Sequence, residues 1–142
     1  MNMKRLIALT AMCLCICTGA ALAGTKPVAA TELEGAWELV SYQLPDSSPE
    51  VSGLMLIKDG HFAISYDMLA PGGTASARSH AGTYRFEAEK LVFDVKWWVE
   101  IVDGVARIVE PQLNPTDFEF AEPNLRLMFT SGSVQHWRRI QP

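Results

Sequence analysis

Residues 90–100 alternate in character with a period of two, and this alternation constrains the fold more than any other feature of the chain. One set of alternate positions is wholly apolar and consists of Leu91, Phe93, Val95, Trp97 and Val99. The other set consists of Val92, Asp94, Lys96, Trp98 and Glu100. Successive side chains of a β-strand point to opposite sides, so the first set is predicted to face a core and the second to face water. Trp98, the exception on the solvent side, is expected to be covered by a loop or by the N-terminal segment.

The same period recurs in short runs that are separated by turn residues. Asp59-Gly60 and Asp103-Gly104 are typical of tight hairpins, because such turns need positive φ at their central positions. The predicted strands are residues 37–43, 53–58, 61–66, 83–87, 90–100, 106–109, 117–121, 125–130 and 133–140. Eight or nine short strands with this spacing predict an all-β fold, a single antiparallel sandwich or barrel.

One long segment, residues 67–80, is predicted to be a loop. It is rich in small and polar residues and contains Pro71-Gly72-Gly73. Loops of this length in a compact domain are usually functional or mobile. We therefore expect the residues that decide function to lie in this segment and along the inner face of residues 91–99.

The N-terminus has the three parts of a secretory signal peptide. Lys4 and Arg5 precede an apolar run at residues 6–18, and Ala21-Leu22-Ala23 supplies small residues for cleavage before Gly24. A second possible cut follows Ala30. The predicted organisation is a signal peptide at residues 1–23, a flexible arm at 24–31 and a barrel domain at 32–142. The expected location is periplasmic or extracellular, with no stable membrane insertion after cleavage.

Cysteine usage and charge exclude several classes of function. All three cysteines, Cys13, Cys15 and Cys17, lie in the predicted signal peptide. The chain after it is therefore predicted to have no disulfide framework, thiolate metal site or cysteine nucleophile. Loss of Lys4 and Arg5 leaves 10 basic and 16 acidic residues, a formal charge of −6 that does not favour nucleic acid. The histidines lack metal-ligand spacing, so neither a metal nor a cofactor is predicted.

Several segments along the domain together resemble a known family. They are Leu33-Glu34-Gly35-Ala36-Trp37-Glu38-Leu39-Val40-Ser41-Tyr42, Asp59-Gly60-His61-Phe62, Ala81-Gly82-Thr83-Tyr84 and His136-Trp137-Arg138-Arg139-Ile140. With the all-β pattern between them, the chain resembles the lipocalin-like branch of the calycin barrels, in particular small bacterial secreted proteins of that type. It departs from the longer lipocalins in lacking the cysteines of their disulfide.

The resemblance implies that the tryptophan-centred ends close the barrel and do no chemistry. Gly35 is expected to let the chain bend closely at the floor, where a Cβ would crowd, and Trp37 to plug that floor. A guanidinium from the last strand can lie over the indole. Arg139 shares a face with Trp137 by period two, so it is favoured over Arg138 as the partner of Trp37.

The sequence predicts a secreted lipocalin-like barrel that binds a small, mainly apolar molecule without chemistry. An eight-stranded barrel is just wide enough to be filled by side chains or to hold one small ligand. The predicted ligand-binding residues are Phe93, Val95, Trp97, Phe118, Phe120, Tyr66, Tyr84 and His136. The same residues could instead fill a core, and sequence does not separate the two interpretations.

Two further classes of function stay open. One is a barrel enzyme of the cyclase or isomerase type acting on an apolar substrate, with Tyr66, Tyr84, Arg85 and His136 as donors or proton carriers. The chain has no G-x-S-x-G, P-loop or Rossmann fingerprint, and no catalytic residue is predicted. The other is a calycin-type inhibitor of a secreted hydrolase that acts through the arm or the 67–80 segment, where Arg78 is the strongest anchor.

Overall fold

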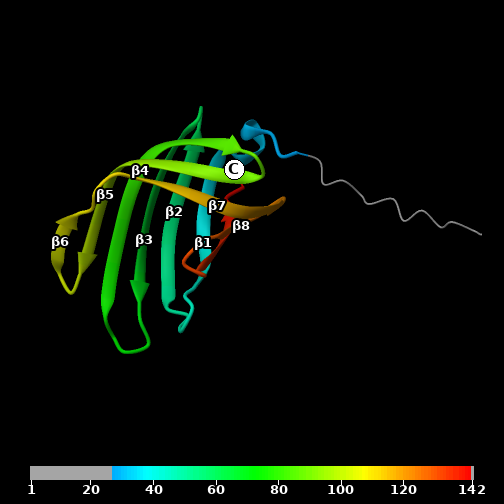
Figure 1. The fold of residues 1–142 in the computed structure, drawn as a ribbon. Helices are drawn as coiled ribbons and strands as arrows, with labels where there is room; N and C mark the ends of the chain where they lie inside the picture. The colour runs from blue at the N-terminus through cyan, green and yellow to red at the C-terminus, as the bar shows by residue number, and fades with distance from the viewer. Residues whose placement is uncertain (1–26, 142) are drawn as a thin grey trace, which may run out of the picture.

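Nine antiparallel strands form one sheet, and eight of them close into a barrel (Figure 1). The computed structural model describes residues 27–141. A short 3-10 helix, η1 (Ala30–Leu33), precedes the strands, which are β1 (Gly35–Gln43), β2 (Glu50–Lys58), β3 (His61–Leu69), β4 (Ala75–Glu87), β5 (Lys90–Val102), β6 (Val105–Ile108), β7 (Gln112–Ala121), β8 (Asn124–Met128) and β9 (Val134–Arg139). The spatial order is β4-β3-β2-β1-β9-β8-β7-β5-β6, and a β4–β5 pairing closes the barrel. The predicted all-β antiparallel barrel is confirmed, with β6 as one extra strand.

The two halves of the barrel differ. We call the end at Gly35 and Arg139 the floor and the opposite end the mouth. On one side, β5 pairs with β7 only through Leu91–Val95, and farther along it pairs with β6 through Val99–Val102. Among the described strands β6 has β5 as its only neighbour, and Figure 1 shows it at the far end of the sheet from β8. The wall is therefore complete at the floor and open along β6 at the mouth.

The floor is closed by one aromatic ring and one guanidinium. Trp37 is fully buried, and the Arg139 guanidinium carbon lies 4.2 Å from the centre of its ring. Arg139 also donates to the carbonyl oxygen of Glu34 and, from Nε, to Oε1 of Glu122 at 2.7 Å. Gly35 has φ +137°, and a Cβ there would lie 2.6 Å from Nη1 of Arg139. The predicted pairing of Arg139 with Trp37 is confirmed, and it explains why this position takes glycine.

The alternation of β5 reverses halfway along the strand, which corrects the sequence prediction. Gly82 is paired with Val95 and Ala81 with Trp97, so Lys96 is the extra residue of a β-bulge. Phe93 and Val95 are buried as expected, but Trp97 is 71% exposed on the outer face, and Val99 shares that face. Trp98 instead faces inward, opposite His80. The predictions that Trp97 and Val99 face the core and that Trp98 faces solvent are wrong, because one inserted residue moves every later side chain to the other face.

Residue 82 shows why the bulge lies at this point. A Cβ at Gly82 would lie 2.0 Å from the carbonyl oxygen of Asp94, so the β5 backbone crosses it at a distance that only glycine permits.

The predicted 67–80 loop is mostly strand. β3 continues to Leu69 and β4 begins at Ala75, which leaves five residues, 70–74, for the connection. The sequence does not predict the first half of β4, because its inward-facing residues Ser76, Arg78 and His80 are polar. The alternation of apolar with polar residues is therefore absent. Similarly, β7 begins at Gln112 and continues through Pro115, which lies opposite Val92.

The N-terminal predictions fall largely beyond the region that the structure describes. The predicted signal peptide lies outside the described residues, and the division into domains stays a prediction. Within the described part, η1 packs against the floor: Leu33 is fully buried, and Tyr84 donates its hydroxyl hydrogen to the carbonyl oxygen of Ala30 at 3.2 Å. No helix among residues 27–141 has the length and apolar character needed to cross a membrane.

Loss of the floor guanidinium should destabilise the barrel. Arg139→Gln removes the contact with Trp37 and a hydrogen bond to the Glu34 carbonyl, so the free energy of unfolding should fall by about 2–3 kcal/mol in urea titrations. Arg138→Gln is the matched control, because it removes an exposed ion pair with Glu38 and should cost about 0–1 kcal/mol. Equal losses in the two variants would contradict the assignment of Arg139 to the floor.

The bulge predicts that two aromatic residues four positions apart differ sharply in their contribution to stability. Phe93→Ala should lower the free energy of unfolding by about 3–5 kcal/mol, because Phe93 is buried 4.9 Å from the ring of Phe62. Trp97→Ala should change it by less than about 1 kcal/mol, since the side chain lies mostly in solvent. A large loss of stability in Trp97→Ala would contradict the bulge and support an unbroken alternation along β5.

Candidate ligand-binding site

The floor half of the barrel is filled by side chains. The inward-facing residues Trp37, Met55, Ile57, Leu91, Val95, Leu125, Leu127 and Trp137 are all less than 2% exposed. An internal space large enough for water would leave accessible surface on its lining, so these side chains pack against one another. The filled-core interpretation therefore holds for this half of the barrel.

A row of polar side chains crosses the inner face in the mouth half. Tyr66 on β3 is opposite Arg78 on β4, Arg78 is opposite Glu100 on β5, and Glu100 is opposite Arg107 on β6. The ring of Tyr42 on β1 adjoins this row, 5.8 Å from the ring of Tyr66. We call Tyr42, Tyr66, Arg78, Glu100 and Arg107 the polar row. It lies where the wall is open along β6.

Glu100 holds the polar row together. It is only 4% exposed, and it accepts hydrogen bonds from Nε of Arg78 and Nε of Arg107, each at 2.7 Å. The hydrogen bond from Arg107 and the charge and hydrogen bond of Arg78 lower the pKa of this carboxyl, although burial opposes them. Two guanidinium groups thus share one carboxylate, so the row has a net positive charge. Arg107 is 66% exposed at its outer end.

Two nitrogen atoms next to this row are buried without partners. His80 and Trp98 are opposite each other one step closer to the floor, with ring centres 5.6 Å apart. Among residues 27–141, neither Nδ1 of His80 nor Nε1 of Trp98 has a hydrogen-bond partner. Buried polar atoms of this kind are rare, because each costs about 1–3 kcal/mol of lost hydration. The indole nitrogen is solely a donor, so its missing partner must be an acceptor.

Burial keeps the neighbouring titratable groups uncharged. Burial, followed by the positive charge of Arg78, lowers the pKa of His80 to about 4, so its imidazole is neutral near pH 7. Burial is also the main reason that the pKa of Tyr66 rises to about 12, and its phenol keeps the proton. The site therefore offers one fixed positive charge in excess, together with neutral donors. It suits a polar acceptor or an anion at the end of an apolar molecule.

The structure brings together few of the residues singled out from the sequence. Tyr66 belongs to the polar row. Phe93 and Val95 are core residues, Tyr84 lies near the floor, and Phe118 and Phe120 are partly buried beside Phe86 and Trp37. Trp97 lies on the outer face. His136 is exposed and outward, since its neighbours Gln135 and Trp137 both face inward.

Sequence reasoning missed the residues that now define the site. The sequence predicts that His80 lies in a loop and that Trp98 and Glu100 lie on the solvent-facing side of a strand. Arg78 was considered only as an anchor for a partner protein. A bulge signal at Gly82 could have found them, but a single glycine in a strand does not reveal which opposite residue is doubled.

The groups considered for catalysis are dispersed. Tyr66 and Tyr84 face inward, whereas His136 faces outward. Arg85 is paired with Glu87 on the outer surface of the barrel. Within residues 27–141, no three His, Cys, Asp or Glu side chains gather in an arrangement that could hold a metal ion.

No model of a protein family, curated protein or solved structure matches this chain. The fold is established by its own strand pairing as an eight-stranded barrel with one additional strand, which is compatible with a lipocalin-like architecture.

The buried imidazole predicts a loss of stability in mild acid. His80 has a pKa of about 4 when folded and about 6.5 when unfolded, so the unfolded chain binds the extra proton as the pH falls below about 6.5. His80 alone should lower the free energy of unfolding by about 2 kcal/mol between pH 7 and pH 5. In urea titrations at both pH values, His80→Phe should remove that part of the decrease. His136→Phe is the exposed control, and an unchanged decrease in His80→Phe would contradict the burial of a neutral ring.

Proposed function

We propose that this protein is a secreted or periplasmic lipocalin-like binding protein that holds a small, mainly apolar molecule in the mouth half of its barrel, without chemistry. The observation that carries the proposal is the pair of buried, unpartnered nitrogens on His80 and Trp98. A bound molecule with an acceptor group at this position would satisfy the indole N–H and recover the free energy lost there.

The surroundings of these nitrogens suit an apolar body. Ile64, opposite His80, and Phe62, one inner position nearer the floor, are buried and apolar, and the rings of Phe62 and His80 are 6.1 Å apart. Of the partly buried apolar side chains packed against the core, four lie in the mouth half: Leu44, Val51, Trp98 and Phe129. Packing the apolar part of a ligand against such side chains contributes roughly 25 cal/mol of favourable free energy per Å² of apolar surface removed from water.

The polar end of the ligand is expected to be anionic or strongly accepting. Arg78 and Arg107 share the single carboxylate of Glu100, so within the described part of the chain this row carries one positive charge in excess. The Arg107 side chain is 66% exposed, whereas Arg78 is bonded to Glu100 on the inner face. A carboxylate at the end of an apolar chain matches this charge and the indole donor.

Binding explains the arrangement better than the two alternatives. The enzyme alternative relied on Tyr66, Tyr84, Arg85 and His136, which do not share one site. The inhibitor alternative relied on the arm at residues 24–31 or on the 67–80 segment, with Arg78 as the strongest anchor. Arg78 instead lies on a paired strand and is bonded to buried Glu100. Neither alternative supplies a hydrogen-bond acceptor for the indole N–H of Trp98.

The test combines identification of the ligand with one pair of neighbouring tryptophans. Native mass spectrometry of protein isolated from its own cells should show a bound mass of a few hundred daltons. In titrations with decanoate, Trp98→Phe should bind about 10-fold more weakly, because a phenyl ring replaces the indole and the indole N–H hydrogen bond is lost.

Trp97→Phe is the matched control and should bind decanoate like the parent protein, since that ring lies on the outer face. The proposal fails if no small molecule co-purifies and neither decanoate nor decanol binds. It also fails if Trp97→Phe weakens binding while Trp98→Phe does not.

A further inference from the structure

The outer face of β2–β5 has two apolar ridges, and the surface between them is made of small residues. Leu54 and Leu56 form one ridge on β2, and Trp97 and Val99 form the other on β5. Strand register places Leu56, Ala63, Ala81 and Trp97 in one row and Leu54, Ser65, Ser79 and Val99 in the next. The four residues between the ridges, Ala63, Ala81, Ser65 and Ser79, are no larger than serine. We call this surface the outer groove.

The outer groove is apolar and open to solvent. Leu54 and Leu56 are 44% and 48% exposed, and Trp97 is 71% exposed. The hollow between the ridges has a volume of about 380 Å³. A soluble protein seldom leaves a tryptophan and several aliphatic side chains together in water unless the surface binds something. Enrichment in exposed aromatic residues is typical of protein interfaces.

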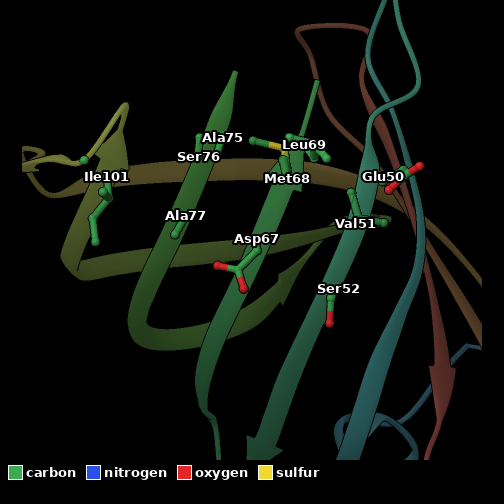
Figure 2. A pocket seen from close by; sticks show the side chains of 11 residues that line it. Glu50, Val51, Ser52, Asp67, Met68, Leu69, Ala75, Ser76, Ala77 and Ile101 are labelled. Carbon is green, nitrogen blue, oxygen red and sulfur yellow. The ribbon is translucent and has the colours of Figure 1, made fainter. Parts of the chain in front are cut away.

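The hollow continues towards the mouth, where it becomes acidic. A second hollow of about 430 Å³ adjoins it and contains Ser52, Asp67 and Ala77 from the next row (Figure 2). Figure 2 shows Asp67 and Ser52 on neighbouring strands, with Glu50 farther along β2. Within the part of the chain that the structure describes, neither Glu50 nor Asp67 is in an ion pair. An occupant with a positive charge at this end would complement both carboxylates.

The width of the outer groove selects among occupants. The ridges are three strand spacings apart, about 14 Å, which accommodates an α-helix of about 10–12 Å diameter. A single hydrocarbon chain would leave most of that width empty. An extended peptide would bury its backbone against side chains, because the sheet backbone beneath is already paired. A helix satisfies its own backbone hydrogen bonds and can approach closely over alanine and serine.

We propose that the outer groove is a docking site for an amphipathic helix of a partner protein. The partner helix presents an apolar stripe to the two ridges and a basic residue to Glu50 and Asp67. The rows from Leu56 to Glu50 extend about 20 Å along the strands, which corresponds to a helix of about 13 residues. This site is separate from the barrel interior, so it does not depend on the proposed small-molecule function.

The test uses synthetic peptides of defined charge. One probe is a labelled amphipathic helix of about 14 residues with leucines on one face and two lysines at one end, and the control peptide has glutamates in place of the lysines. Fluorescence anisotropy should show at least 10-fold tighter binding of the lysine peptide. Asp67→Lys should reverse this preference, whereas Glu89→Lys in the exposed turn between β4 and β5 should leave it unchanged.

A second variant tests the shape of the groove. Ser79→Phe places a large side chain between the ridges at an exposed position. It should weaken binding of the lysine peptide at least 10-fold with little change in stability. Equal binding of both peptides, or no effect of Ser79→Phe, would overturn the proposal. It is also overturned if light scattering shows a dimer that Ser79→Phe dissociates, since the occupant is then a second copy, or if decylamine binds there and the helices do not.

Discussion

The extra residue at Lys96 determines the character of both faces of the barrel. Because β5 gains one residue opposite Gly82, its inner face changes from Phe93 and Val95 to Trp98 and Glu100. Its outer face receives Trp97 and Val99 at the same point. The bulge depends on a close backbone approach that no side chain at position 82 would allow. The interior polar site and the exposed apolar groove are therefore two results of one backbone irregularity.

The floor provides stability while the mouth departs from good packing. Trp37, Arg139 and the backbone carbonyls of Glu32, Leu33 and Glu34 form a closed end without any disulfide, since the sequence has no cysteine after Cys17. In the mouth half, a buried carboxylate and two unpartnered nitrogens reduce the net stability that the same volume of apolar residues could provide. Local departures of this kind are expected where a fold retains a binding site.

Charge is distributed differently inside and outside the barrel. Inside, Arg78 and Arg107 exceed Glu100 by one positive charge, although the chain as a whole is acidic. On the outer face, Glu50 and Asp67 lie beside apolar ridges, and neither forms an ion pair with any cation in residues 27–141. The two surfaces would thus select ligands of opposite sign, and neither preference can be deduced from the net charge.

The sequence alone determined the all-β fold, most of the strands, the Asp59-Gly60 hairpin and the closure of the floor by Trp37 and Arg139. The fold, the strands and the hairpin depend on local turn chemistry and on a period of two, which short segments report directly. The closure of the floor was implied by the resemblance to lipocalin-like barrels, and the period of two selected Arg139 over Arg138. Only the tertiary structure decided which side of β5 faces the interior, because a bulge is defined by the partner strand as well as by its own residues. For the same reason Arg78, His80, Trp98 and Glu100 became a site only when β4 and β5 were placed in register. Their polar side chains gave no apolar pattern to find, and the contacts that define them join residues about twenty positions apart in the chain.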